Sequence, residues 1–170
     1  MFDEIDLKIL DIIQKNARTA NVEIARQAGL APSAILERVR KLEERKVVQS
    51  FSAQLDPQAL GLGLLAFVFV RSREKVGRSQ TGRRLAAIPE VQEVHNIAGE
   101  DCYLVKVRAR DTEGLGRVLR EKIGAIDSVL STRTTIVLET VKETMQLPLS
   151  PRKQDPPASV PRRARAGGAR

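Results

Sequence analysis

The sequence predicts an α+β protein in which an N-terminal winged helix-turn-helix precedes a C-terminal ferredoxin-like βαββαβ domain. Three observations lead to this fold class. Near the N-terminus, apolar residues recur at helical spacing in three short stretches, and a glycine-to-proline corner separates the second stretch from the third. After residue 63 the pattern changes to a continuous apolar run. Strand and helix patterns then alternate in the order β-α-β-β-α-β.

Changes of composition divide the chain. We expect the helix-turn-helix domain at residues 1–55 and the ferredoxin-like domain at 64–145. Between them, "LDPQALGLGLL" carries a proline and two glycines, which favours a linker at 56–63. Residues 146–170 are basic, rich in proline and poor in apolar residues, so we expect a disordered tail that acts as an electrostatic arm.

The first two helices follow from periodicity and end signals. Asp3 is a suitable N-cap for a helix over about 4–15, whose apolar face is Ile5, Ile9, Ile12 and Ile13. Val22, Ile24, Ala25 and Ala28 predict a short second helix. Gly29 ends it, because glycine most easily takes the left-handed conformation after a helix.

A third helix should begin at Pro32, since a proline suits the first helical position. Ile35, Val39 and Leu42, with Leu36 flanking them, mark its buried side. The outward residues are then Ser33, Glu37, Arg40, Lys41 and Glu44. The segment "VVQSFSAQL" that follows alternates loosely, and we interpret it as the strands of a small wing.

The second domain is predicted from its strands and helix caps. "LLAFVFVRS" is typical of a strand buried on both faces, with more apolar side chains than one layer of helices can cover, which favours self-association. Residues 78–88 are weakly helical. "VQEVHNIA" and "CYLVKVRA" form two strands around the short loop "GED". Asp111 can cap a helix over "DTEGLGRVLREKIG", and "SVLSTRTTIVLETV" is a final strand rich in β-branched residues.

Composition excludes several classes of protein. One cysteine excludes an intramolecular disulfide, and one histidine leaves too few ligands for a structural zinc site. Acidic residues stand where a signal peptide needs basic ones, and the longest apolar run, 62–70, is too short to span a bilayer. We therefore expect a cytoplasmic protein with no membrane, metal or cofactor.

The net charge of +8 is unevenly distributed. Residues 148–170 contain six basic residues and one acid, a net +5, which leaves 8 − 5 = +3 for residues 1–147. The folded body is therefore nearly balanced, and only local clusters of charge can indicate a nucleic-acid partner.

The third helix carries such a cluster. A run of cations on a helix is usually only a solvated face, but this one lies on the second helix of a helix-turn-helix, whose N-terminus can also hold a phosphate. Glu37, Glu43 and Glu44 temper the charge, so a dimer is needed for useful affinity. The candidate contacts to double-stranded DNA are Pro32, Ser33, Ala34, Glu37, Arg38, Arg40, Lys41 and Lys46.

The sequence gives little support to an enzymatic function. Cys102 and His95 have no third partner that would make them a nucleophile and base. "GLGLLA" matches a dinucleotide-binding pattern in letters, yet it precedes a strand instead of following one. The sequence contains no Walker loop, paired catalytic carboxylates or metal constellation, so we predict that the protein is not an enzyme.

Residues 3–145 resemble the Lrp/AsnC, or feast/famine, transcriptional regulators. "DEIDLKILDIIQKNAR" is similar to the family's first helix and "EIARQAGLAPSAILERVRKLEERKVV" to its helix-turn-helix. "IAGEDCYLVKVRARD" and "STRTTIVLETVKE" resemble its effector domain. The resemblance implies an N-terminal DNA-binding domain and a C-terminal effector domain that forms homodimers or larger oligomers and, in many members, binds an amino acid between subunits.

The chain departs from the family pattern at several positions. Ala20 and Ala31 stand where the family caps its second and third helices with serine or threonine; Asn21 offers a substitute cap at the first. Lys46 replaces a common glycine, so the turn either holds a left-handed lysine or has another shape, and this extra cation could touch a phosphate.

A further departure concerns the effector site. Cys102 occupies the position of an aspartate suited to a ligand's ammonium group, and Asp101 can replace it only from a loop, since successive strand residues face opposite sides. The effector candidates are Gly99, Asp101, Cys102, Thr132 and Thr134. The alternative, that Asp101 is a turn residue and the threonines are ordinary strand formers, stays open.

The sequence thus predicts a sequence-specific transcriptional regulator that responds to an amino acid or a related small metabolite. Two other functions stay open: a DNA-organising protein that ignores small molecules, and an amino-acid-binding regulatory subunit of a metabolic enzyme.

Overall fold

The computed structural model describes residues 2–74 and 79–149. The described residues form two compact units, one of residues 2–53 together with 144–149, and one within residues 54–143. Most of the predicted tail, residues 150–170, lies outside the described residues.

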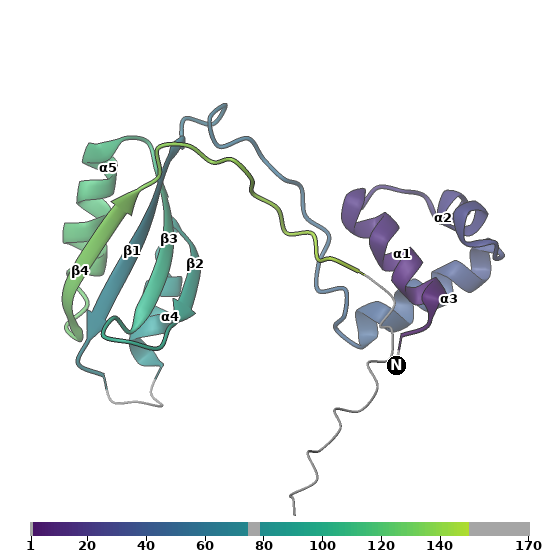
Figure 1. Cartoon of the computed structure of the whole chain (residues 1–170), viewed down its shortest axis with the longest axis horizontal. Helices are drawn as coiled ribbons and strands as arrows, with labels where there is room; N and C mark the ends of the chain where they lie inside the picture. Colours follow the sequence, from purple (N-terminus) through teal and green to yellow (C-terminus); the bar gives the residue numbers. More distant parts are fainter. Residues whose placement is uncertain (1, 75–78, 150–170) are drawn as a thin grey trace, which may run out of the picture. The chain divides into compact units, whose positions relative to one another are not determined.

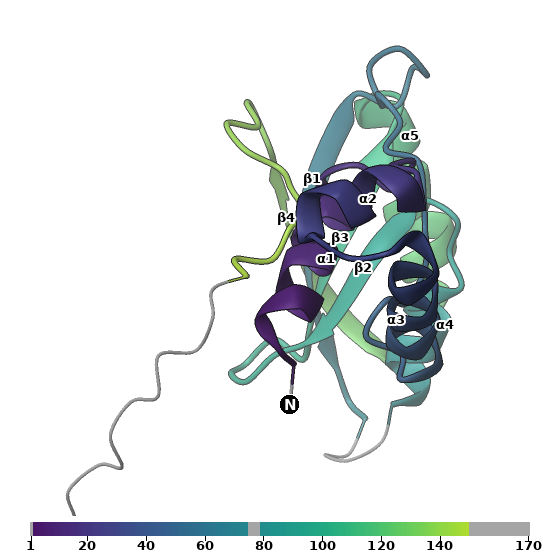
Figure 2. The ribbon, with the colours of Figure 1, turned by 90° about the vertical axis from the view of Figure 1, so that its right-hand side faces the viewer.

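The helical unit contains α1 (Glu4–Lys15), α2 (Asn21–Ala28) and α3 (Pro32–Glu44) (Figure 1). Asp3 caps α1 as predicted: its carboxylate accepts a hydrogen bond from the Asp6 N–H at 2.7 Å, and the Asp6 carboxylate accepts one from the Asp3 N–H at 3.3 Å. The three helices bury a shared core of Ile9, Ile13, Ile24, Ala25, Ile35 and Leu42. The axes of α2 and α3 cross, with a short turn between them (Figure 2).

Both helices of the helix-turn-helix lack a side-chain N-cap. Ala20 and Ala31 make no capping hydrogen bond, and Asn21 is already the first residue of α2 and offers no substitute. At the other end, α2 terminates at Gly29 with a φ of 70°, and Lys46 follows α3 with a φ of 57°. Lysine therefore holds the left-handed position where glycine would be unstrained.

The predicted wing does not form as strands. Residues 47–55 contain no strand in the structure. Instead Val47 and Val48 pack against the core of the helical unit, while Phe51 and Leu55 are exposed. A strand is stabilised by its neighbours, and within this unit no partner strand is described for the segment.

The second unit is a four-stranded antiparallel sheet with helices on one face (Figure 1). Its elements are β1 (Leu64–Ser72), α4 (Gln80–Ala86), β2 (Val91–Asn96), β3 (Tyr103–Ala109), α5 (Thr112–Arg117) with its π-helical continuation (Val118–Ile123), and β4 (Val129–Ile136). The strand order β2-β3-β1-β4 completes the predicted βαββαβ topology. Asp111 caps α5 through a 2.7 Å hydrogen bond from the Gly114 N–H.

The sheet buries one face under α4 and α5. Ala66, Val68 and Val70 of β1 alternate with residues that are partly exposed, so a single chain buries one face of this strand, and burial of both faces stays a prediction that depends on self-association. Residues that are paired across antiparallel strands share a face. The other face, which we call the open face, therefore carries Phe67 and Phe69 of β1. No helix in the described part of this unit covers it.

Candidate functional site

The outer side of α3 is formed by the stripe Ser33, Leu36, Glu37 and Arg40, at positions i, i+3, i+4 and i+7. All four side chains are exposed, and Ile35 and Leu42 anchor the opposite side in the core. Of the other predicted DNA contacts, Pro32, Lys41 and Lys46 are also exposed, and Ala34 is partly so. The helix therefore presents its first three turns to solvent.

Leu36 was expected on the flank of the buried side, and this is wrong. Its side chain is 58% exposed. Successive residues of an α-helix are about 100° apart, so Leu36 turns outward when Ile35 points into the core.

The cations on the outer side of α3 are paired within the helix. Arg40 contacts Glu37 at 3.1 Å and Glu44 at 3.3 Å, and Lys41 lies 3.4 Å from Glu37. Hydrogen bonds from Arg40, and then from Lys41, hold the pKa of Glu37 below its ordinary value. The same contact with Glu37 raises the pKa of Arg40. Such exposed pairs contribute little to stability and are screened by salt, so phosphates can displace them.

Arg38 does not face outward with the other cations. Its Nη1 donates hydrogen bonds to Asp3 Oδ2 at 2.8 Å and Asp6 Oδ1 at 2.7 Å, at the start of α1. The pKa of Asp3 is lowered first by the backbone N–H of Asp6 and then by Arg38. Arg38 therefore joins α3 to α1, and the helical spacing alone could not reveal a partner more than thirty residues away.

Three of the candidate effector residues, Gly99, Asp101 and Cys102, lie at the hairpin between β2 and β3. The Ile97 N–H donates to the Cys102 carbonyl at 3.0 Å, and Gly99 between them has a φ of 131°. Asp101 precedes β3 and so lies in the loop, the position from which it could replace the aspartate of the family. Its Oδ2 accepts a hydrogen bond from Arg133 Nη2 at 2.9 Å. Arg133 also stacks over the Phe69 ring at 4.0 Å, on the open face.

The structure does not bring the threonines to this ion pair. Thr132 is paired with Val70 and Thr134 with Val68, so both lie on the helix-covered face. Cys102 is partly buried, and its thiol donates to the Ser72 carbonyl at 3.4 Å. The predicted set therefore divides between the two faces of the sheet.

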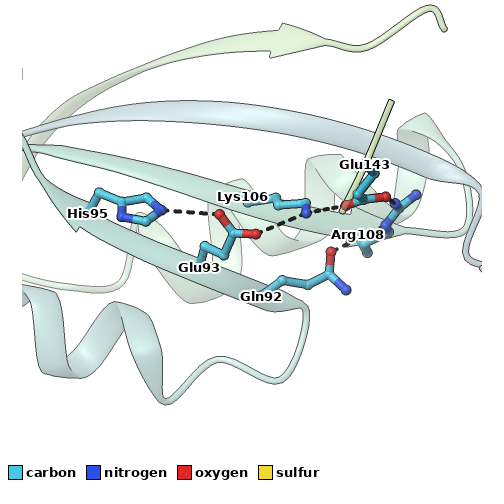
Figure 3. A network of polar contacts seen from close by, with 6 residues as sticks. All are labelled: Gln92, Glu93, His95, Lys106, Arg108 and Glu143. Atoms are coloured by element: carbon cyan, nitrogen blue, oxygen red, sulfur yellow. Dashed lines mark hydrogen bonds and ion pairs between the residues drawn. The ribbon is translucent and has the colours of Figure 1, made fainter. Parts of the chain in front are cut away.

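A polar network on the open face was missed by the sequence analysis (Figure 3). Glu93 links His95, at 3.1 Å, to Lys106, at 3.0 Å. Glu143, in the segment after β4, contacts Lys106 and lies 2.8 Å from Arg108. Burial alone would lower the pKa of Lys106, but the carboxylates of Glu143 and Glu93 outweigh it and raise the pKa.

This network fastens the segment after β4 to β3. Alternation along "CYLVKVRA" places Lys106 and Arg108 on one face and is the one signal that could have indicated them. Within residues 2–74 and 79–149, no cluster of ligating side chains could hold a metal ion. None of the helices described there combines the length and apolar character that crossing a bilayer requires.

Comparison with protein families gives two matches. Residues 2–43 match the AsnC-type helix-turn-helix domain, and residues 65–147 match the Lrp/AsnC ligand binding domain. Together the two matches cover both units.

Relatives are similar over most of their length. The HTH-type transcriptional regulator FL11 of Pyrococcus horikoshii is 43% identical over 148 residues, which cover 86% of this chain and 96% of that protein. The leucine-responsive regulatory protein of Escherichia coli K12 is 35% identical over 152 residues, covering 88% and 93%.

Solved structures of transcriptional regulators have a similar fold. A transcriptional regulator from Neisseria meningitidis in complex with L-Met has a TM-score of 0.82 at 31% identity and covers 88% of this chain and 97% of that one. A feast or famine regulatory protein from M. tuberculosis, complexed with L-methionine, has a TM-score of 0.79 at 34% identity, covering 86% and 99%. The chain therefore belongs to the Lrp/AsnC family: it is a DNA-binding transcriptional regulator with a ligand-binding domain, and not an enzyme.

Proposed function

We propose that the protein is a sequence-specific regulator that binds its operator as a dimer through α3, and that an α-amino acid bound at the 97–102 loop changes this binding. The observation that carries the proposal is the ion pair between Asp101 and Arg133, 2.9 Å apart, at the edge of an otherwise open sheet face. It supplies both charges that a zwitterionic ligand requires.

DNA contact is assigned to the exposed side of α3. Pro32, Ser33 and Ala34 form its N-terminus. Pro32 has no N–H and the Ala34 N–H donates to the Ala31 carbonyl at 3.0 Å, so the Ser33 N–H is the backbone donor that can hold a phosphate. Arg40 and Lys41 give up only weak surface pairs when they contact DNA.

Changing Arg40 and Lys41 together to alanine should weaken specific binding at least ten-fold without altering the helical circular dichroism, since about two phosphate or base contacts are lost. The affinity is measured by gel shift on DNA from upstream of the protein's own gene. An unchanged affinity of the folded double variant would contradict the role of this face.

Dimerisation is assigned to the open face. Phe67, Phe69 and Leu104 lie beside each other there and are only partly buried in one chain. A second copy would bury these rings, and a two-fold pair also provides the two α3 helices that a palindromic operator requires.

Phe69→Glu should shift the mass measured by analytical ultracentrifugation from dimer to monomer, because it places a charge in an apolar contact. Leu60→Glu, at an exposed turn, is the matched control and should leave the dimer intact. A folded Phe69→Glu dimer would show that the chains meet elsewhere.

The ligand proposal follows from charge. An α-amino acid carries an ammonium group, which can donate hydrogen bonds to the Asp101 carboxylate. It also carries a carboxylate, which the guanidinium of Arg133 can bind in a bidentate manner. The left-handed Gly99 and the backbone of Cys102 shape the loop around this pair. Two relatives of known structure hold L-methionine, and another is named leucine-responsive, which favours an apolar amino acid.

A ligand of this kind acts only if it favours one assembly of the chain over another. Its differential affinity for two arrangements of the dimers then changes the spacing of the paired α3 helices.

The test is a melting-temperature screen against the twenty amino acids, followed by analogues of the responsive one that lack either the ammonium or the carboxylate. Both analogues should fail to raise the melting temperature. Asp101→Asn should abolish the response to the intact amino acid, whereas Thr132→Val, on the opposite face, should keep it.

An undiminished response of Asp101→Asn would place the ligand elsewhere. If none of the twenty amino acids shifts the melting temperature of a protein that binds DNA specifically, the ligand-independent DNA-organising function is favoured instead. The existing engagement of Asp101 by Arg133 is the observation that keeps this second candidate in view.

A further inference from the structure

Leu36 is the one apolar residue of the α3 stripe, and neither the core nor an ion pair explains its position. It lies between Ser33 and Arg40 and is 58% exposed, whereas Ile35 and Leu42 of the same helix are buried. Single exposed leucines are ordinary on protein surfaces. Leu36 differs from them because it lies in the first two turns of α3, the helix to which we assign DNA contact.

The orientation of Leu36 is fixed by its surroundings. Ile35 is completely buried, and Arg38 fastens α3 to Asp3 and Asp6 of α1. Leu36 could turn inward only if α3 rotated about its axis, which would pull Ile35 out of the core and break the Arg38 contacts. The leucine is therefore held outward before any DNA is bound.

The chemistry of the stripe changes along the helix. Its first exposed cation is Arg40, because Arg38 is engaged by α1. The N-terminal part of α3, which in a helix-turn-helix comes closest to the base edges, presents Ser33, Leu36 and Glu37 instead. In the major groove the apolar group that a leucine can contact is the C5-methyl of thymine.

We propose that Leu36 is a specificity-determining residue whose side chain packs against the C5-methyl of one thymine in each half-site of the operator. The inference rests on the proposed function, in which the outer side of α3 enters the major groove. Ser33 and Arg40, one turn away on either side, provide polar contacts to the neighbouring bases. The residue selects T·A at that position, because no other base carries an apolar group there.

The experiment uses the full chain and the best duplex selected from a random pool. Each thymine of one half-site, together with its symmetric copy, is replaced in turn by deoxyuridine, which removes only the methyl group. For the wild type we expect one position at which the replacement weakens binding about four-fold per half-site, the loss expected for one buried methyl group. Leu36→Ala should weaken binding to the thymine duplex at least as much and should not distinguish thymine from deoxyuridine there.

Two variants serve as controls. Leu36→Met keeps an apolar side chain of similar reach and should retain the discrimination. Leu60→Ala removes a leucine of the same 58% exposure from a turn of the other unit and should behave as the wild type.

Three outcomes overturn the proposal: a selected half-site without thymine, no thymine whose methyl matters, or a Leu36→Ala variant that still discriminates at the sensitive position. Each of these outcomes would be observed with a protein that still binds DNA specifically, so none of them contradicts the proposed function. A wild type that selects no sequence from the pool overturns both.

Discussion

Replacing Lys46 with glycine should stabilise the helical unit and weaken DNA binding at the same time. At the end of α3, the Lys46 N–H donates to the Glu43 carbonyl at 2.9 Å, and the Val47 N–H donates to the Leu42 carbonyl at 2.9 Å. These two bonds form a Schellman motif, which requires a left-handed residue at position 46. Gly29 fills the corresponding role after α2 with a φ of 70°.

The size of the stabilisation follows from the backbone. A left-handed conformation costs a residue with a side chain about 1–2 kcal/mol, while glycine gains about 0.5–1 kcal/mol of conformational freedom in the unfolded chain. The net stabilisation is about 0.5–1 kcal/mol, which corresponds to a rise of about 2–8 °C in the melting temperature of a unit of this size.

The effect on DNA binding has the opposite sign. The Lys46 side chain is exposed, and we propose that it contacts a phosphate. Its loss should reduce the slope of log affinity against log salt concentration by about 0.9 for each subunit. Lys46→Ala separates the two effects, because it removes the charge but keeps the left-handed strain.

The assay combines urea unfolding, followed by circular dichroism, with gel shifts at several salt concentrations. Lys46→Gly should gain stability and lose affinity, whereas Lys46→Ala should lose the same affinity without the gain. If glycine does not raise the urea midpoint above that of alanine, the strain argument is refuted. If both variants keep the wild-type salt slope, Lys46 touches no phosphate.

Two further predictions concern packing and charge. Arg38→Gln should destabilise the helical unit in urea at neutral pH. Because the folded-state pKa of Asp3 is below its ordinary 3.8, the stability it contributes with Arg38 is present above that pH and lost below it, so the two proteins should converge in acid. Gly82→Ala should destabilise the sheet unit by about 1–3 kcal/mol through overpacking, and so lower its melting temperature, since the new Cβ would lie 2.9 Å from the buried Tyr103 ring. An unchanged melting temperature would show that the ring can move freely.

The fold could be predicted where its signals are local. Caps and periodicity located α1 and α2 within a residue, because Asp3 and Gly29 act on their own helix ends. The prediction of wing strands at residues 47–55 was wrong for a related reason. Loose alternation after α3 describes a segment that could pair, but strand formation depends on a partner that the segment itself does not specify.

The candidate site was less predictable because its contacts join distant parts of the sequence. In the sequence, Arg38 looks like one more cation of α3 that could contact DNA, yet its partners lie at the start of α1. Asp101 was correctly expected in a loop, but its pairing with Arg133 depends on how β4 is added to the sheet edge. The same strand register places Thr132 on the opposite face.

The salt dependence of DNA binding also separates the folded body from the basic tail. Arg40, Lys41 and Lys46 are the proposed phosphate contacts of each subunit, so a dimer should show a slope of about −5 in log affinity against log salt concentration. Residues 150–170 carry six further basic residues and one acid. If they act as an electrostatic arm, the full chain should have a steeper slope, and a chain truncated after Leu149 should return to about −5 with its base discrimination intact, because phosphate contacts carry no sequence information. Equal slopes for the two chains would remove the tail from the DNA interface and leave the affinity to the paired α3 helices alone.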